Sequence, residues 1–179
     1  MGSQTPSVRI VPEYDYTDGA DAVRILAVGK LVVDPWQSEV LNDWMGRTNE
    51  DIWSAPTCGL SVPRQNGKTL DTSGRIASGM VMYSEWVIYT AHLQKTATET
   101  FMELKGLFES RGLRKYVKEI KAALGREQII LKNGGRVVFV ARTRNGGRGL
   151  HGDCLVFDEA QELTSEQQAS FLPAISASR

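Results

Sequence analysis

The chain has 179 residues, with 21 Lys or Arg against 21 Asp or Glu, so its formal net charge is zero. At 41% apolar and 23% charged residues it has the composition of one ordinary globular domain, and charge alone gives no argument for a nucleic-acid partner. No apolar run approaches the roughly 20 residues of a membrane span, and the first residues do not predict a signal peptide. Cys58 and Cys154 are far apart, which predicts two small core residues in a reducing compartment rather than a disulfide or zinc framework.

In chain order, residues 1–20 are polar and predict a flexible N-terminal arm, and residues 21–179 predict one domain. Pro35-Trp36-Gln37 predicts the start of a helix that reaches about Gly46. The apolar run 58–62 predicts a buried strand, which passes through a short loop into a helix from about Lys68 to Tyr83.

Residues 86–91 predict a second strand because they are rich in β-branched and aromatic side chains. A helix is expected next, since apolar residues recur at steps of three and four at Ala97, Phe101, Leu104 and Phe108. A further helix is expected over residues 113–124. Asn133-Gly134-Gly135 lies between two apolar runs, 128–131 and 136–141, and predicts a hairpin.

A glycine-rich loop over residues 144–149 leads to the apolar run 154–157, which predicts a strand. Thr164 and Gln167 form a capping-box pattern before a last helix that reaches about Leu172. Strands that alternate with helices predict an α/β fold with a mostly parallel central sheet, covered on both faces as a three-layer sandwich.

Residues 62–69 (Val-Pro-Arg-Gln-Asn-Gly-Lys-Thr) match the phosphate-loop pattern GxxxxGK[ST], except that Val62 stands at the first glycine. Gly67 allows a tight turn whose N–H groups face phosphate oxygens, and the following helix adds its dipole. In this pattern Lys68 reaches the β- and γ-phosphates and the Thr69 hydroxyl binds Mg²⁺. The alternative is a plain helix start with a solvated lysine, but the position between an apolar run and a helix favours nucleotide binding.

Asp158 and Glu159 directly follow the apolar run 154–157. Carboxylates at the carboxyl end of a parallel strand face the ligand crevice of such folds, so Asp158 is expected to bind Mg²⁺ and Glu159 to deprotonate the attacking water. A helix start decorated with acids is the alternative. Together with the phosphate loop, this pair predicts a P-loop NTPase of the ASCE (RecA-like) type that hydrolyses ATP with Mg²⁺.

Several motifs occur in one order: Pro35-Trp36-Gln37, the phosphate loop with Arg64, Tyr89-Thr90-Ala91-His92, Arg148-Gly149, and the run Leu-Val-Phe-Asp-Glu-Ala-Gln at 155–161. In this order they resemble the N-terminal ATPase domain of the large terminase subunit of tailed bacteriophages, the motor that packages DNA into procapsids. The resemblance covers about residues 30–179. It is most specific in the phosphate loop, which lacks the first glycine and contains Arg64, and in Asp-Glu-Ala-Gln.

The resemblance implies roles for individual residues. Gln37 would hydrogen-bond the adenine base with Trp36 packed nearby, and the phosphate-binding set would be Arg64, Gln65, Asn66, Gly67, Lys68 and Thr69. Arg64 would lie near the γ-phosphate as a sensor or arginine finger in cis, and Arg148 would reach the ATP of a neighbouring subunit in a ring. The alternatives are a packed tryptophan beside a helix-start glutamine, and arginines (Arg142, Arg144, Arg148) that solvate a glycine-rich loop or contact DNA phosphates.

The resemblance also implies double-stranded DNA, portal protein and small terminase subunit as partners, and action in the host cytoplasm at the procapsid rather than as a virion component. A complete member continues into a coupling motif and a nuclease domain, so we expect this chain to be a fragment that stops before both. Two other functions stay open: a helicase-like nucleic-acid remodelling ATPase, and a nucleotide-binding module inactive as a fragment. His92 and His151 lack metal-ligand spacing and receive no role.

Overall fold

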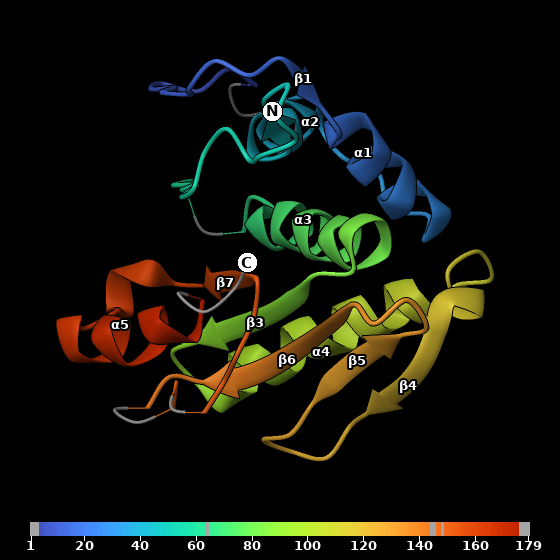
Figure 1. Ribbon diagram of the computed structural model, residues 1–179, viewed down its shortest axis with the longest axis vertical. Helices are drawn as coiled ribbons and strands as arrows, with labels where there is room; N and C mark the ends of the chain where they lie inside the picture. The colour runs from blue at the N-terminus through green and yellow to red at the C-terminus, as the bar shows by residue number, and fades with distance from the viewer. Residues whose placement is uncertain (1–3, 64, 144–145, 148, 176–179) are drawn as a thin grey trace. The chain divides into compact units, whose positions relative to one another are not determined.

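The computed structural model describes residues 4–63, 65–143, 146, 147 and 149–175 (Figure 1). Its contacts divide the chain into two compact units, Met1–Ser78 and Gly79–Arg179, and each is described by itself. No helix in the described residues is long and apolar enough to cross a membrane.

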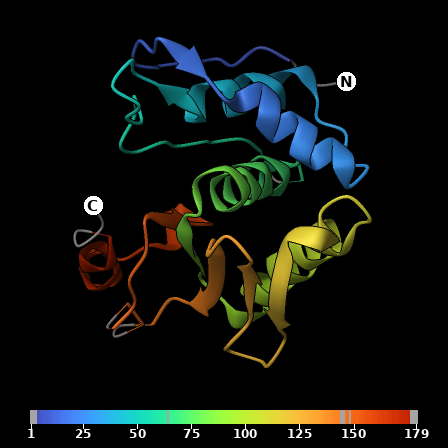
Figure 2. The same cartoon turned by 45° about the vertical axis from the view of Figure 1, so that its right-hand side comes forward.

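The first unit is mainly helical, with α1 (Gly19–Val28), α2 (Pro35–Trp44) and the first turns of α3 (Lys68–Tyr83) (Figure 2). Two short strands, β1 (Tyr16–Thr17) and β2 (Gly46–Arg47), pair antiparallel. Leu26 and Leu41 are fully buried between the helices. A Cβ at Gly74 would lie 2.9 Å from Leu26 Cδ1 and 3.1 Å from Leu41 Cδ2, so glycine lets the backbone of α3 approach both leucines.

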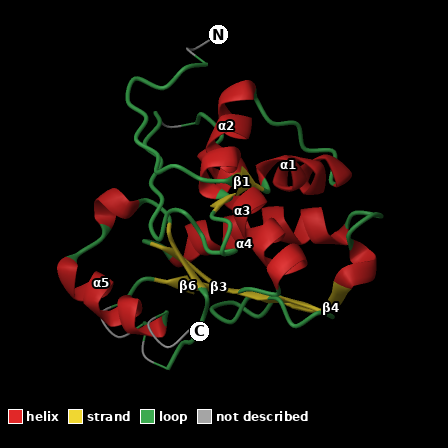
Figure 3. Cartoon of the chain, turned by 45° about the horizontal axis from the view of Figure 1, so that its top comes forward, coloured by secondary structure: helices red, strands yellow, loops and turns green. Residues whose placement is uncertain are grey.

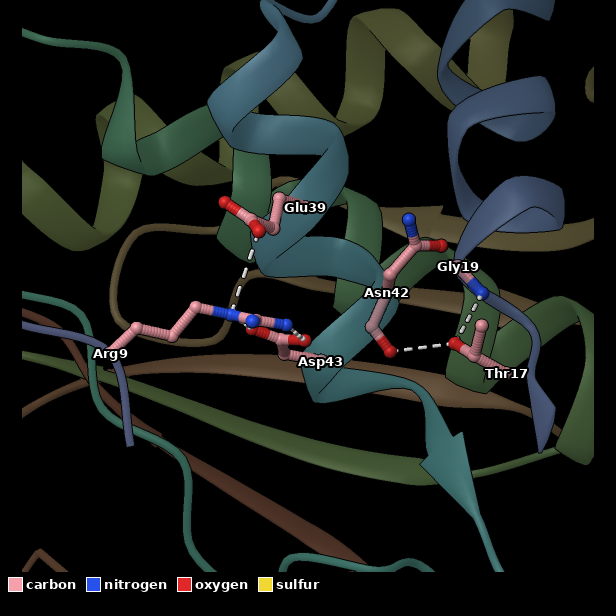
Figure 4. A network of polar contacts seen from close by, with 6 residues as sticks. All are labelled: Arg9, Thr17, Gly19, Glu39, Asn42 and Asp43. Atoms are coloured by element: carbon pink, nitrogen blue, oxygen red, sulfur yellow. Dashed lines mark hydrogen bonds and ion pairs between the residues drawn. The ribbon is translucent and has the colours of Figure 1, made fainter. Parts of the chain in front are cut away.

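Polar contacts attach the N-terminal segment to α2 (Figure 4). Arg9 donates from Nε and Nη2 to the two carboxylate oxygens of Asp43, at 2.9 and 2.8 Å. Thr17 Oγ1 donates to the carbonyl of Asn42 at 2.6 Å and accepts from the Gly19 N–H at 3.1 Å, which satisfies one of the free donors at the start of α1.

The second unit contains a five-stranded sheet in the order β4-β5-β6-β3-β7. Its strands are β3 (Trp86–Ala91), β4 (Val117–Lys121), β5 (Gln128–Leu131), β6 (Arg136–Ala141) and β7 (Cys154–Phe157). β3 runs parallel to both β6 and β7, with Tyr89 opposite Phe139 and Val156. β4, β5 and β6 pair antiparallel.

Successive side chains of a strand point to opposite faces, and a helix packs on each face of this sheet, with α5 at the end away from β4 (Figure 3). On one face α4 (Gln94–Glu109) brings Phe101 edge-on to Phe139, which in turn packs against Tyr89. On the other face α5 (Ser165–Phe171) brings Phe171 edge-on to Phe157, next to the buried Ile88. Within this unit the expected three layers are therefore present.

Several predicted elements are confirmed. The helix at Pro35, the helix over 68–83, the strand over 86–91 and the hairpin over 128–141 occur as predicted. The predicted apolar face of α4 is buried at all four positions, Ala97, Phe101, Leu104 and Phe108. The capping box is also present, since Thr164 Oγ1 accepts from the Gln167 N–H at 3.2 Å.

The prediction of a mostly parallel sheet is not confirmed, because the sheet is mixed. The connections explain the difference. Only residues 132–135 join β5 to β6, and residues 122–127 join β4 to β5. A parallel connection needs a crossover of a dozen or more residues, so these short links allow antiparallel pairing alone.

The helix predicted over 113–124 is wrong, because a 3₁₀ turn (Arg114–Tyr116) and strand β4 occupy this segment. A bulge between Val117 and Glu119 shifts the register of β4 against β5. An extra residue in a strand changes which face the later side chains occupy, so Val117 and Ile120 are both half-buried although they are three residues apart. This spacing resembles that of a helix.

The strand predicted over 58–62 is also wrong. The segment has no regular secondary structure and pairs with no described strand, and Cys58 is exposed rather than in the core. An apolar run becomes a strand only where neighbouring strands accept its backbone hydrogen bonds. Cys154 is half-buried on β7, and it forms no disulfide with Cys58. Helix α1 was not predicted.

Candidate functional site

The end of the predicted phosphate loop turns at a glycine into a helix, as the sequence pattern predicts, although the strand predicted before the loop is absent from the described residues. Gly67 has φ of 80°, the left-handed region that glycine enters without strain, and α3 begins at the next residue, Lys68. The Gly67 carbonyl accepts the Leu70 N–H at 2.9 Å. Residues 65–67 are exposed, and Thr69 lies in the first turn of α3. The loop therefore presents its end and a helix N-terminus to an anion.

Gln37 holds this turn from the start of α2. Asp34 is the N-terminal cap of α2, and its N–H donates to Gln37 Oε1 at 2.8 Å. Gln37 Nε2 donates to the Gly67 carbonyl at 3.0 Å. The side chain is 4% exposed, whereas the neighbouring Trp36 is half-buried. Gln37 thus has a structural contact with the loop, and the adenine contact expected of it stays a prediction.

Asp71, in the first turn of α3, is fully buried, and among the described residues neither of its carboxylate oxygens has a hydrogen-bond partner that meets ordinary geometry. Burial raises the pKa of Asp71 to about 7, and the nearby Gln37 amide opposes this increase. The sequence pattern gave this residue no role, because a polar residue in a first helical turn is ordinarily solvated.

The raised pKa of Asp71 predicts a pH-dependent stability. Between about pH 4 and 7 the folded chain holds a proton that the unfolded chain has lost, so this group's contribution to stability is full at low pH and falls as pH rises toward 7. Asp71→Asn cannot lose that proton. We expect the variant to gain roughly 2–4 kcal/mol relative to wild type between pH 4.5 and 8, measured by urea unfolding. A difference that stays constant over this range would contradict a buried, titrating carboxyl.

The second group of predicted residues lies in the other unit, where three parallel strands end together. β3 ends at Ala91, β6 at Ala141 and β7 at Phe157. The Asp158 N–H donates to the Thr90 carbonyl at 2.9 Å, and the Arg142 N–H donates to the Ala91 carbonyl at 2.8 Å. Thr90 Oγ1 also donates to the Val156 carbonyl at 2.8 Å. These bonds fix the turn at Asp158 and Glu159, called the acidic turn below, to strand β3.

Both carboxylate oxygens of Asp158 are held. The Tyr89 hydroxyl donates to Oδ2 at 2.6 Å, and the Glu159 N–H donates to Oδ1 at 2.9 Å. Because Tyr89 has a single hydroxyl proton, Thr100 donates its own to the Tyr89 oxygen, at 2.9 Å. Burial, and then the bond to Asp158, raise the pKa of Tyr89 above its ordinary value, so it remains a donor. The carboxylate is therefore oriented before any ligand binds.

Glu159 has an unusual backbone, with φ of 50° and ψ of 53° in the left-handed region. Few residues with a side chain adopt this conformation, which costs roughly 1–3 kcal/mol and persists only where surrounding contacts offset that cost. Arg142 binds both carbonyls of this turn: its Nη1 donates to the Asp158 carbonyl at 2.6 Å and its Nη2 donates to the Glu159 carbonyl at 3.1 Å. The Arg142 side chain is 4% exposed.

Among the described residues, no three His, Cys, Asp or Glu side chains lie close enough to hold a metal ion by themselves. A Mg²⁺ ion in a nucleotide site takes only one or two protein ligands and completes its shell with phosphates and water. Asp158 fits such a role, because a carboxylate oxygen has two lone pairs, and the hydrogen bonds from Tyr89 and from the Glu159 N–H use one on each oxygen.

Sequence reasoning missed two residues of the acidic turn. Tyr89 was recognised only as part of a strand-end motif, and Arg142 was expected in a solvated loop or on DNA. Arg142 is instead buried against backbone carbonyls, so neither expectation holds for it. A charged residue directly after the apolar run 136–141 was the available signal. Arg64, Arg144 and Arg148 lie outside the described residues.

No protein-family model matches this sequence, and no curated protein matches it. The fold is similar to the crystal structure of the HK97 bacteriophage large terminase, with a TM-score of 0.72 and 16% sequence identity. The match covers 91% of this chain and 36% of that chain, so this chain spans about a third of the length of that terminase. At this identity the similarity shows the fold, and at that level the expected terminase resemblance is confirmed.

Proposed function

We propose that the chain is the ATPase domain of a viral DNA-packaging motor of the large-terminase type, which hydrolyses ATP to move double-stranded DNA into procapsids. The observation that carries the proposal is an oriented Asp158-Glu159 turn at the carboxyl end of β7, on a fold similar to that of a large terminase. The glycine turn into the helix at Lys68 supports the proposal further, because a phosphate-binding loop ends in such a turn.

In this proposal Lys68 binds the β- and γ-phosphates, the exposed backbone of residues 65–67 binds phosphate oxygens, and Gln37 and Trp36 contact the base. Thr69 and Asp158 are each proposed as a Mg²⁺ ligand, and the ion would neutralise charge on the phosphates. Glu159 orients a water molecule and accepts its proton. Arg64 and Arg148 are proposed to neutralise charge on the transferred phosphoryl group, one from the same subunit and the other from a neighbour in a ring.

The proposal is tested by phosphate release from ATP with Mg²⁺, with EDTA, and with duplex or single-stranded DNA added. We expect Mg²⁺-dependent release that duplex DNA stimulates. Stimulation by single-stranded DNA alone would favour the helicase-like ATPase. Nucleotide binding without any release would favour the inactive binding module. Absence of nucleotide binding would contradict all three.

The described residues offer a surface for DNA, although the chain as a whole is neutral. Residues 111–132 contain seven Lys or Arg against two Glu, and all seven basic side chains are exposed. They lie in or near the 3₁₀ turn, in the edge strand β4 and in the loops that follow β4 and β5: Arg111, Arg114, Lys115, Lys118, Lys121, Arg126 and Lys132. A local basic surface of this kind binds the phosphates of duplex DNA without reading its sequence.

Charge reversal tests this surface. We expect Arg114→Glu, Lys115→Glu and Lys118→Glu together to weaken binding of a random-sequence duplex at least about tenfold, and to lower the slope of log K against log salt by about 2–3, because each phosphate contact contributes about 0.9. Fluorescence anisotropy at several salt concentrations gives both values.

The matched control reverses three exposed basic residues elsewhere, Arg24, Lys30 and Lys95. An equal loss in the control would show a dependence on net charge only, and an unchanged slope in the test variant would exclude residues 114–118 as the contact. Lysines on the edge strand β4 can also keep other chains from pairing with it. If that were their only role, their reversal would not change the salt dependence of DNA binding.

The remaining partners follow from the same proposal. A packaging ATPase works as a ring on the portal protein, receives DNA from the small terminase subunit, and acts in the host cytoplasm without becoming part of the virion.

A further inference from the structure

We infer that Arg142 is a positioning residue for hydrolysis: its buried guanidinium clamps the carbonyls of Asp158 and Glu159 and holds Glu159 in the left-handed conformation that aims its carboxylate. The inference rests on the proposed function, because Glu159 is the base only if the chain hydrolyses ATP. Nothing in the resemblance or the comparisons assigns this role to Arg142.

The two terminal nitrogens of the Arg142 guanidinium act as a fork of hydrogen-bond donors. Nη1 and Nη2 donate to consecutive backbone carbonyls, of Asp158 at 2.6 Å and of Glu159 at 3.1 Å. Nη1 also donates to the Thr90 carbonyl at 3.1 Å. A guanidinium is a planar group with donors in fixed directions, so it fixes both peptide groups of the turn relative to β3. A lysine ammonium lacks that planar fork.

The residue between the two bound carbonyls, Glu159, has a left-handed backbone conformation. Glu159 has φ of 50°, in a left-handed region that is costly for a residue with a side chain and that four other described residues also occupy (Lys30, Asp51, Gln65 and Ser84). The two clamped carbonyls flank this residue's own φ and ψ angles, because one belongs to the preceding peptide and the other to its own. Strained backbone at a reacting group is a recurring feature of active sites, where it sets the direction of the side chain.

Burying the positive charge of Arg142 costs free energy. Arg142 is 4% exposed, burial lowers the pKa of its guanidinium, and its Nε has no partner among the described residues. The side chains of Asp158 and Glu159 act in the opposite direction by their charge. A buried guanidinium that mainly binds carbonyls adds little to the stability of a fold, because its desolvation offsets the hydrogen bonds. Its presence is explained if it holds the backbone of the Asp158-Glu159 turn in one conformation.

The test compares Arg142→Lys with wild type in two measurements. The first is the amide-to-Hα cross-relaxation of Glu159 by NMR, which is strong in the left-handed conformation. We expect it to be strong in wild type and weak in the variant. The second is kinetic: kcat should fall about 100-fold, as for a catalytic group displaced by about 1 Å, while the dissociation constant for ATP changes less than about threefold.

Arg136→Lys is the matched control, because Arg136 lies at the other end of the same strand β6, stacked 3.6 Å from the Trp86 ring centre. It should leave both measurements unchanged. Where Arg142→Lys does not fold, Arg142→Gln replaces it, since it retains one donor without the charge. Weak cross-relaxation at Glu159 in wild type, or an unchanged Glu159 signal and kcat in the variant, would overturn the inference. Wild type without hydrolysis would instead refute the proposed function, and the NMR comparison would still decide whether Arg142 holds the turn.

Discussion

Replacing Lys68 with alanine is expected to remove ATP binding at ordinary nucleotide concentrations. Lys68 is the first residue of α3, directly after the left-handed turn at Gly67. A charge-assisted hydrogen bond to phosphate contributes about 2–3 kcal/mol, so the dissociation constant should rise roughly 30- to 150-fold. Isothermal titration calorimetry with ATP and Mg²⁺ measures this change directly.

Lys95→Ala is the control, because Lys95 also lies in the first turn of a helix, α4, and its side chain is 85% exposed. Its ATP affinity should equal that of wild type. Unchanged affinity in Lys68→Ala would refute the phosphate-loop assignment, whatever the similarity of folds.

Replacing Glu159 with glutamine is expected to separate binding from hydrolysis. Glutamine keeps the size and the backbone of the acidic turn but cannot accept a proton from water. A general base contributes typically 10²–10⁴ in rate, so kcat should fall by about that factor while the ATP dissociation constant stays within about threefold.

Glu162→Gln serves as its control, because Glu162 is an exposed carboxylate of the next 3₁₀ turn, Ala160–Glu162. Full activity in this control excludes a general effect of lost negative charge. Equal activity in wild type and Glu159→Gln would remove Glu159 from the mechanism.

Local signals in the sequence predicted the parts of the site that depend on neighbouring residues. The Gly67-Lys68 junction has a left-handed glycine followed by a helix, as the phosphate-loop pattern requires. Phe157 ends a strand and Asp158 follows it, as the apolar run with two acids predicted. In such places a few adjacent residues determine the conformation, so the sequence pattern is sufficient.

Signals that depend on distant pairing were misinterpreted. Val117 and Ile120 have helical spacing, but a bulge against β5 gives a strand the same spacing. Residues 58–62 are apolar enough for a strand, yet they pair with no strand in the described part of the chain. The position of Arg142 directly after an apolar run was a signal, but its role could not be predicted. Its partners are backbone carbonyls 16 and 17 residues away, and the amino-acid sequence does not indicate which carbonyls a side chain contacts.

The most direct test of the central claim is phosphate release from Mg²⁺-ATP by wild type and Glu159→Gln in parallel, at ATP concentrations where binding assays show equal occupancy. The proposed ATPase predicts release by wild type at least about 100-fold above the variant. Equal release, or none from a wild-type protein that binds ATP, would contradict it.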